Sequence, residues 1–294
     1  MSNKLLKTGA SSVILGSDHY KNYFQEKKGK LLKITKIIKN HNELTHLNLI
    51  RSIDNYHKYF TIPDRELYEL KPDCEFYQHI KKLVQYENMK IFNNNLTCYY
   101  IDYSGDLELF DAINNISDFR DKTYWNSYDS ILKFSIQIMT GLKYLHNKNL
   151  CHLDIKPENI ILDIKTKTAR IIDFGFCSKE PFQEYIYDVR GTPGYFPKHI
   201  ENNDIQELPK ILANDLEVRN GKTPMMLNYN LVYKIDSYCF GRVLLLLKQT
   251  YNKNVFTCFN LENRTKKKIN YIIELLLEND VFKRKTVTEI LEML

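Results

Sequence analysis

The chain has 294 residues, of which 43% are hydrophobic and 27% are charged, and its 42 lysines and arginines exceed its 36 acidic residues by six. This size and composition exclude a disordered chain and predict either one large domain or two lobes. The charge excess is too mild to indicate nucleic-acid binding, and we expect the lysine run at 266–268 to be a solvated helix end.

Six cysteines occur at positions 74, 98, 151, 177, 239 and 258, with no CxxC pair and no histidine at a zinc-site spacing. The pattern predicts free thiols in a reducing, cytoplasmic environment and no cysteine-bound metal. The longest apolar run, 243–247, is far too short to cross a bilayer, and the amino terminus lacks the apolar core of a signal peptide. No pattern in the chain reports an oligomeric state.

The first hundred residues predict short strands with one helix among them. Strand-like segments occupy 5–15, 30–34 and 59–62, and a polar helical stretch spans about 42–53. The pattern changes at about 100–106, beyond which apolar residues recur at helical spacing. We therefore expect a small strand-rich part followed by a larger helical part.

The second part begins with a strong helical signal. Between positions 131 and 145 the apolar residues recur every three or four places, which predicts a core-facing helix that ends near Asn147. The apolar segments 160–162 and 169–172 flank a polar tip and predict a β-hairpin. Further apolar helices are expected at 237–247, 269–277 and 287–294.

Four polar residues border this hairpin and carry the chemistry. They are two carboxylates, an amine and an amide, namely Asp154, Lys156, Asn159 and Asp173. Because a hairpin returns its ends to each other, Asn159 and Asp173 are placed to share a bound cation, and their oxygens suit Mg²⁺ held together with substrate phosphates. A carboxylate, a nearby cation and magnesium ligands are the set that phosphoryl transfer requires.

The segment HLDIKPEN at 152–159 resembles the catalytic loop of eukaryotic-type protein kinases, and DFG at 173–175 resembles their magnesium-binding triplet. The two motifs occur in the right order and at hairpin spacing, which makes their joint occurrence by chance improbable. The resemblance extends over nearly the whole chain. It implies an α+β, bilobal protein-kinase-like fold, with a small strand-rich N-lobe at about 1–100 and a larger, mainly helical C-lobe at about 101–294.

The resemblance also implies a role for each residue of the set. Asp154 is expected to be the catalytic base and Lys156 to contact the γ-phosphate of ATP, whereas Asn159 and Asp173 are expected to hold Mg²⁺. The residues that follow the base are similar to the serine/threonine branch of the family. They imply transfer of the γ-phosphoryl group to serine or threonine hydroxyls of protein substrates.

The nucleotide-binding residues match the family less closely. KTGASSVI at 7–14 stands where kinases carry G-x-G-x-x-G-x-V, so Gly9 alone retains a motif glycine, with small residues beside it. The segment at 30–34 resembles the strand whose lysine holds the α- and β-phosphates, and Lys33 is preferred over Lys30 and Lys36. A surface lysine is the alternative for each.

Two acidic residues complete the expected nucleotide site. Glu43, on the helix that begins near position 42, is expected to pair with Lys33, with Glu66 as the alternative. The segment 99–107 resembles the connection between the lobes, where backbone groups read adenine and Asp106 reaches the ribose. An exposed loop aspartate is an equally good interpretation of Asp106.

Further resemblances lie downstream of the hairpin. GTPGY at 191–195 is similar to the segment that positions a peptide substrate, and Asp236 stands at the start of a helix that resembles the central buried helix of kinases. The resemblance implies that Asp236 accepts backbone hydrogen bonds from the catalytic loop. A helix cap is the alternative role. Arg284 resembles the arginine near the end of kinase domains.

Three departures from the family pattern concern regulation. Leu153 replaces the arginine that pairs with a phosphorylated activation segment in many kinases, so we expect activity without that ion pair. PKH at 197–199 replaces Ala-Pro-Glu and removes the usual carboxylate partner of Arg284, unless Glu201 substitutes. An insert at about 201–228 is either a substrate or partner site or a solvated excursion.

The degenerate glycine loop and the compact helix region resemble kinases encoded by large DNA viruses, which would place the protein in host cytoplasm or a virion. Two other functions stay open on the residues alone. One is a pseudokinase that binds partners without phosphoryl transfer, and the other is a small-molecule kinase of related fold. The intact set around Asp154 favours the enzyme, and the segment 191–195 favours a peptide substrate.

Overall fold

The structure is a computed structural model that describes residues 5–8, 12–36, 41–83, 95–102, 105, 107–114, 127–179, 191–195, 197, 229–254 and 263–294. The chain divides into two compact units. The first comprises Met1–Leu47 and Thr61–Tyr103, and the second comprises Asn48–Phe60 and Ser104–Leu294. The residues at 48–60 lie within the part that was predicted to be strand-rich, but they group with the helical unit.

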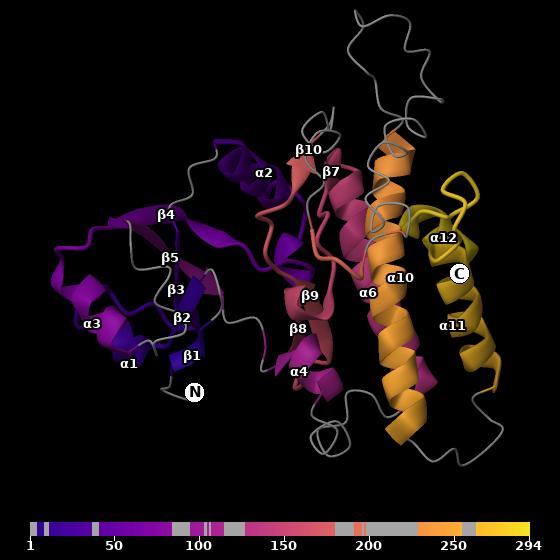
Figure 1. Ribbon diagram of the computed structural model, residues 1–294, viewed down its shortest axis with the longest axis horizontal. Helices are drawn as coiled ribbons and strands as arrows, with labels where there is room; N and C mark the ends of the chain where they lie inside the picture. Colours follow the sequence, from indigo (N-terminus) through magenta and orange to yellow (C-terminus); the bar gives the residue numbers. More distant parts are fainter. Residues whose placement is uncertain are drawn as a thin grey trace, which may run out of the picture. The chain divides into compact units, whose positions relative to one another are not determined.

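The first unit is built on an antiparallel sheet, whose order within the described residues is β1-β2-β3-β5-β4 (Figure 1). Its strands are β1 (Leu5–Thr8), β2 (Ser12–Leu15), β3 (Lys30–Lys36), β4 (Pro63–Leu70) and β5 (Leu96–Asp102). The helices α1 (Ser17–Tyr20) and α3 (Glu75–Leu83) accompany it. The helix α2 (His41–Arg51) begins in this unit.

The core of the first unit lies on one face of the sheet. Leu32 and Ile34 of β3 are fully buried and pack in a cluster with Val13 of β2 and Cys98 of β5. Since successive strand residues point to opposite faces, Lys33 projects from the other face. The strand alternation thus separates the core residues of β3 from its lysine.

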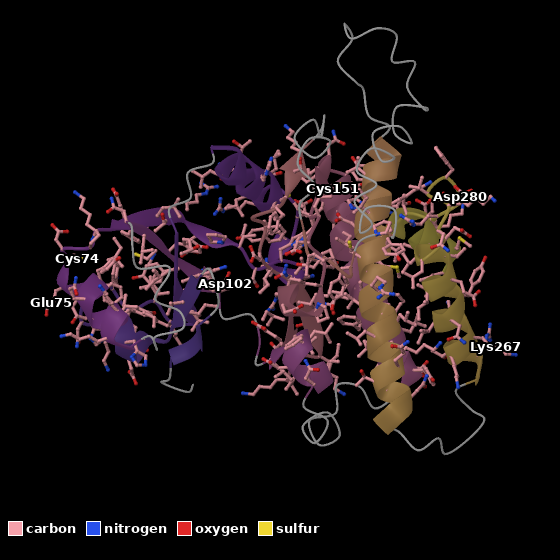
Figure 2. All side chains as sticks on the ribbon, viewed as in Figure 1. Cys74, Glu75, Asp102, Cys151, Lys267 and Asp280 are labelled. Carbon is pink, nitrogen blue, oxygen red and sulfur yellow. The ribbon has the colours of Figure 1, made fainter. Side chains whose placement is uncertain are left out.

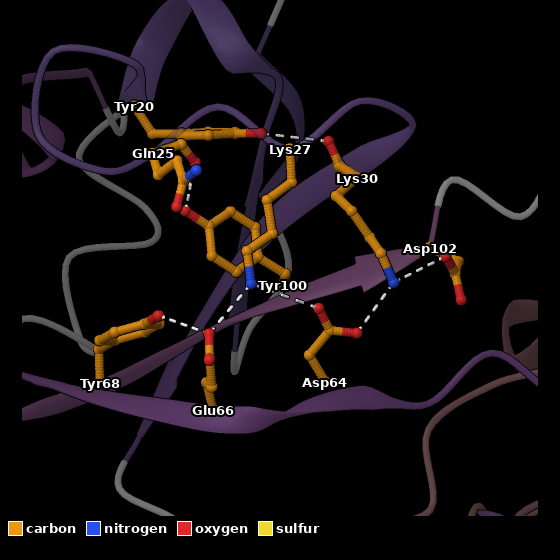
Figure 3. Close-up of polar contacts among 9 residues, drawn as sticks. All are labelled: Tyr20, Gln25, Lys27, Lys30, Asp64, Glu66, Tyr68, Tyr100 and Asp102. Atoms are coloured by element: carbon orange, nitrogen blue, oxygen red, sulfur yellow. Dashed lines mark hydrogen bonds and ion pairs between the residues drawn. The ribbon is translucent and has the colours of Figure 1, made fainter.

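A charge network ties the turn before β3 to the neighbouring strands (Figure 3). Lys27 donates to Glu66 at 3.0 Å, and Lys30 pairs with Asp64 at 2.9 Å and with Asp102 at 2.8 Å. These pairs connect β3 with β4 and with the end of β5. They lie at the surface, where water screens each pair and limits its contribution to stability.

The second unit contains most of the helices and the hairpin. Its helices are α4 (Leu109–Asn114), α6 (Tyr128–His146), α10 (Tyr229–Asn254), α11 (Asn263–Leu276) and α12 (Val287–Met293), with 3-10 turns η1 (Tyr56–Lys58) and η3 (Pro157–Asn159). Its strands are β6 (Leu107–Glu108), β7 (Leu150–Cys151), β8 (Ile160–Asp163), β9 (Thr168–Ile171) and β10 (Ser178–Lys179).

Helix α6 confirms the apolar spacing read from the sequence, since the residues of that stripe are buried. Ser127 caps its amino end by accepting a hydrogen bond from the backbone of Ser130. At its carboxyl end, Asn149 turns the chain through a positive φ of 57° into β7. The helix packs against α10, α11 and α12, so it lies at the centre of the helical unit (Figure 1).

Helices α10 and α11 approach each other closely at a glycine. A Cβ on Gly241 would lie 2.8 Å from Cβ of Leu276 and 2.8 Å from Cδ2 of Leu277. Such contacts are shorter than atoms tolerate, so the two helices pack at this distance because position 241 has no side chain. The predicted helix at 237–247 forms the middle of α10.

The predicted strand at 59–62 is wrong. Phe60 forms only an isolated bridge with Ile171, and the regular strand β4 begins at Pro63. Tyr59 and Phe60 lie instead beside the hairpin, where Ile171 donates its backbone N–H to Tyr59 at 2.8 Å. The predicted strands at 5–15 and 30–34 and the polar helix near 42–53 are confirmed.

The lysine run at 266–268 lies near the amino-terminal end of α11, in agreement with the helix end that was predicted. Lys267 is exposed and points outward, whereas Lys268 donates to the backbone of Leu294 and Lys266 lies 5.7 Å from the ring centre of Tyr128 (Figure 2). None of the helices in the described ranges combines the length and apolarity needed to cross a bilayer.

Candidate active site

The loop that follows β7 is anchored through its backbone by Asp236 of α10. The carboxylate of this residue is fully buried and accepts the backbone N–H of His152 at 2.9 Å and that of Leu153 at 2.8 Å. The His146 ring donates its Nε2–H to the same carboxylate at 3.0 Å. Leu153 adopts a φ of 64°, which is costly for a leucine, and these hydrogen bonds hold it there.

The electrostatics of Asp236 match this role. Burial alone would raise the pKa of its carboxyl, but the hydrogen bond from His146 and the nearby histidine rings outweigh burial and lower the pKa. The residue is therefore a carboxylate at neutral pH. It acts as a buried acceptor for the loop, as the sequence resemblance implied, and is more than a helix cap.

His146, Cys151 and Asp236 place their ligand atoms within 4.8 Å of one another, a spacing that metal ions use. Figure 2 labels Cys151 in the helical unit. Burial raises the pKa of the Cys151 thiol well above its ordinary value, which keeps it protonated and a poor ligand. Because the carboxylate already accepts three N–H groups, we interpret the cluster as a hydrogen-bond network.

The side chain of Asp154 is the centre of the candidate site. Its Oδ2 forms an ion pair with Lys156 Nζ and accepts a hydrogen bond from Asn159 Nδ2, both at 2.9 Å, and its Oδ1 accepts the hydroxyl proton of Thr192 at 2.6 Å. Lys156 also donates to Thr192 Oγ1 at 2.6 Å. Asp154, Lys156 and Thr192 thus form a closed triangle of one ion pair and two hydrogen bonds, which places an amine and a hydroxyl around one buried carboxylate.

Asn159 holds a fixed orientation within this set. Its Nδ2 donates both to the backbone oxygen of Asp154 at 2.8 Å and to the side chain of that residue. The amide hydrogens are used by these contacts, so the oxygen Oδ1 is the atom left for a cation. These two hydrogen bonds thus fix the orientation of the Asn159 amide group.

The predicted hairpin is confirmed and brings the two motif segments together. In it Ile160 pairs with Ile171 and Asp163 with Thr168, and directly beyond it Ile172 donates its N–H to the backbone oxygen of Asn159 at 3.0 Å. The next residue, Asp173, is exposed and has a φ of 63°. This sharp turn follows the last contact of the hairpin.

The ring of His152 links the two motif segments from the inside. Its Nδ1 accepts the backbone N–H of Asp154 at 3.3 Å, so its Nε2 carries the proton that is donated to the oxygen of Ile172 at 3.1 Å. The same ring meets Phe174 edge to face at 5.1 Å, and Phe174 packs on Phe60 at 5.8 Å. The buried Phe174 therefore fixes the chain next to Asp173.

Of the expected nucleotide residues, Lys33 is the one whose side chain the structure describes. Lys33 is half-buried on β3, directly opposite Ile14 of β2 and Tyr99 of β5. Glu43 falls within α2, but its side chain lies outside the described residues, as do Gly9 and Asp106.

The alternatives for Lys33 and Glu43 have partners of their own. Lys30 pairs with Asp64 and Asp102, and Glu66 pairs with Lys27 and accepts a hydrogen bond from Tyr68 (Figure 3).

Two residues of the site were not predicted from the sequence to make the contacts that the structure shows. Thr192 was expected only to position a peptide, yet it contacts Asp154 directly from 38 positions away, and His146 meets Asp236 from 90 positions away. The threonine in GTPGY was the only available signal for the first. For His146 the sequence carries no signal beyond its place at the end of an apolar helix.

The comparison with protein families decides the identity of this arrangement. The model of the protein kinase domain matches residues 20–294. The chain belongs to the protein kinase family. The match includes both motif segments and the helical unit, so the resemblance read from 152–159 and 173–175 is confirmed at the level of the family.

Similar proteins include several protein kinases. The chain is 29% identical over 182 residues to Serine/threonine-protein kinase ELM1 of Saccharomyces cerevisiae, which covers 57% of the chain and 28% of that protein. It is 33% identical over 134 residues to Calcium-dependent protein kinase 4 of Plasmodium berghei, covering 44% and 23%. The kinase PK-1 of Cydia pomonella granulovirus shares the fold with a TM-score of 0.56 and 19% identity, over 98% of this chain and 92% of that one.

The first curated relatives are much longer than the part that matches, since the alignments cover 28% or less of their length. The structural likeness to the granulovirus kinase concerns the fold alone.

Arg284 is held by backbone oxygens and an aromatic ring. The guanidinium is buried and donates to the backbone oxygens of Glu278, Asn279 and Lys234 at 2.8–3.4 Å, and it lies 4.7 Å from the ring centre of Tyr238. Burial lowers its pKa to about 10. Glu201, the substitute partner considered from the sequence, lies outside the described residues.

Proposed function

We propose that the chain transfers the γ-phosphoryl group of ATP to serine or threonine hydroxyls of protein substrates, with Asp154 as the catalytic base. The observation that carries the proposal is the contact set of Asp154, in which one buried carboxylate meets Lys156, Asn159 and Thr192. A protein that had lost phosphoryl transfer would have no chemical reason to keep this set closed.

In this mechanism the substrate hydroxyl approaches Asp154 and gives its proton to the carboxylate as its oxygen attacks the γ-phosphorus. The bond from that phosphorus to the bridging oxygen breaks, and ADP leaves. Lys156 stabilises the negative charge on the transferred group, because its ammonium can turn from Asp154 towards the phosphoryl oxygens. Thr192 keeps Asp154 and Lys156 in register while the proton moves.

The donor set fits magnesium. Asn159 offers an amide oxygen whose orientation is fixed by Asp154, and Asp173 offers an exposed carboxylate. Oxygen ligands of this kind, completed by phosphates and water, are those that Mg²⁺ prefers, and the ion neutralises phosphate charge when bound. We therefore assign Asn159 and Asp173 to Mg²⁺.

We assign the nucleotide contacts to residues of the first unit and the connection that follows it. Lys33 would bind the α- and β-phosphates, with Glu43 as its partner, and Gly9 would let the backbone approach the phosphates. Asp106 would contact the ribose. The support for Lys33 is its position on the face of β3 opposite the apolar core, together with the engagement of Lys30 in other ion pairs.

We further propose that residues 1–294 act as a single kinase domain in the cytoplasm, with the segment 201–228 as an insert that lies outside the described residues. Leu153 is fully buried and contributes only its backbone to the Asp236 contact. The residue offers no charge for a phosphorylated activation segment, which supports activity without that modification.

The test compares phosphate incorporation from [γ-³²P]ATP into a basic protein by the wild type and Asp154→Asn, with and without Mg²⁺. We expect a loss of at least about 100-fold in the variant, because a positioned base contributes on that order or more. Asp129→Asn, which removes an exposed carboxylate of α6, serves as the matched control and should retain activity. Equal incorporation by the wild type and Asp154→Asn would support a scaffold without phosphoryl transfer.

A further inference from the structure

A cavity of about 360 Å³ lies in the helical unit, and none of the side chains that contact Asp154 in the described residues lines it. It is formed by the carboxyl end of α6, the amino-terminal part of α10 and the start of α12. Its walls include His146, Tyr233, Lys234, Thr286, Thr288 and Glu289. The volume falls within the range of natural small-molecule sites, about 300–1,000 Å³.

Lys234 supplies a buried positive charge to this cavity. It is 9% exposed, and within the described part of the chain its ammonium donates one hydrogen bond, to the backbone oxygen of Phe282 at 3.1 Å, and meets no carboxylate at ion-pair distance. Burial lowers the pKa of Lys234, and the positive charge of Arg284 lowers it further. The negative charge of Glu289 partly offsets this decrease. An ammonium carries three donors, so a bound anion would satisfy what the protein leaves open.

His146 provides a second, independent indication. It is 5% exposed, and its Nδ1 is buried without a hydrogen-bond partner among the described residues. Since Nε2 already contacts Asp236, Nδ1 is the ring atom that lacks a hydrogen-bonding partner. The ring stacks on Tyr233 with centroids 4.4 Å apart, and this pair gives the cavity an apolar wall beside the unsatisfied nitrogen.

Glu289 limits the charge of the ligand. Its carboxylate is occupied by Lys285 at 3.1 Å and by the backbone N–H of Thr286 at 2.7 Å, but its negative charge remains in the wall. A doubly charged phosphate would be repelled more strongly than a singly charged carboxylate. The site thus favours a small ligand that carries one negative charge and one group able to form a hydrogen bond.

We propose that this cavity binds a small organic monocarboxylate that also carries a hydroxyl, with the carboxylate at Lys234 and the hydroxyl, which can donate or accept, at His146 Nδ1. His146 connects the site with the candidate active site, because the same ring holds Asp236 and thereby the loop at His152. Binding does not require phosphoryl transfer, so the proposal stands or falls separately from the proposed function.

The test uses 3- and 4-hydroxybenzoate as probes in calorimetric titrations of the full chain. We expect saturable binding at one site for at least one isomer, with binding at least tenfold weaker for the uncharged hydroxybenzamide. Lys234→Met should weaken binding about 10- to 100-fold, the range for a hydrogen bond to a charged group. Lys283→Met, whose side chain is 76% exposed and does not line the cavity, should bind as the wild type does.

Two further measurements cover a Lys234→Met variant that fails to fold. In the wild type, the ¹⁵N signal of His146 Nδ1 should shift on titration, and Thr288→Val should weaken binding about two- to tenfold. The absence of saturable binding, an unmoved Nδ1 signal, or equal affinity in Lys234→Met would overturn the proposal. Tighter binding of inorganic phosphate or of an acidic peptide would overturn the assigned ligand class.

Discussion

Replacing Asp236 by asparagine tests how the catalytic loop is held. The carboxylate accepts three N–H groups, from His146, His152 and Leu153, whereas an amide of the same shape offers one oxygen and two donors. Whichever way the amide turns, its NH₂ group faces at least one N–H of the protein. The variant therefore loses one or two of the three hydrogen bonds and removes the charge from the remainder.

The expected cost follows from these contacts. A hydrogen bond to a charged group contributes about 1.5–3 kcal/mol, so losing one or two, with a buried donor left facing another, predicts about 3–5 kcal/mol of destabilisation. A loss of this size is a large share of the stability of a typical domain. The strained backbone of Leu153 should be released with it, and the amides of His152 and Leu153 should exchange faster with solvent.

The effect should also depend on pH in a defined direction. The pKa of Asp236 in the folded chain is lowered, so its contribution to stability is complete above the unfolded pKa of about 4 and is lost as pH falls through the folded pKa. The difference in unfolding free energy between the wild type and Asp236→Asn should thus be largest at neutral pH and shrink below about pH 4.

Guanidinium unfolding followed by far-ultraviolet circular dichroism measures this difference, and amide hydrogen exchange measures the local release. Asp129→Asn, which changes an exposed carboxylate on α6, is the control and should stay close to the wild type. An Asp236→Asn chain within about 1 kcal/mol of the wild type at pH 7 would refute the reasoning, since the loop would then be held by other contacts.

Three further outcomes are expected. Thr192→Val should lower kcat about 10- to 100-fold with little change in unfolding, because it removes one hydroxyl from the reacting set, and Thr192→Ser should restore most of the activity in the same phosphate-incorporation assay. Gly241→Ala should destabilise the chain by about 1–3 kcal/mol in guanidinium unfolding, because the new methyl group would lie 2.8 Å from Leu276, whereas Gln249→Ala on the exposed side of α10 should not. Arg284→Lys should cost about 3 kcal/mol in the same measurement, because a compact ammonium cannot reach the three separate backbone oxygens that the planar guanidinium spans.

The parts that the sequence predicted well are those whose signal is local. The catalytic segment 152–159 is contiguous, and two apolar runs with a polar tip between them predict the hairpin that follows it. The buried stripe of α6 has a regular period over 19 residues. In each case neighbours in sequence determine the structure, so pattern and propensity suffice.

The elements that the sequence missed lack such a pattern for physical reasons. β4 has the sequence PDRELYEL and is exposed along much of its length, so its charged residues hide a strand. β5 has the opposite character, because its first five residues are all buried and show no alternation. The misplaced strand at 59–62 arose because Phe60 is buried although it forms only an isolated bridge, with Ile171, and packs its ring on Phe174.

Contacts between distant segments were the hardest part of the site to foresee. Thr192 joins Asp154 across 38 positions and His146 joins Asp236 across 90, and single-sequence patterns do not report such pairs. Their chemistry became visible only when the fold placed a hydroxyl and an imidazole against buried carboxylates.

Leu153 shows how the site can depart from its family and keep its geometry. The residue makes its contact to Asp236 through the backbone N–H, and its side chain is fully buried. A leucine at this position therefore brings no charge but keeps the backbone hydrogen bond that fixes the loop. The neighbouring backbone N–H of His152 also donates to Asp236, and this contact likewise involves no side chain of the loop. Within the described residues, the loop before Asp154 is thus held by main-chain contacts to helix α10, and these contacts require no charge on the side chain at position 153.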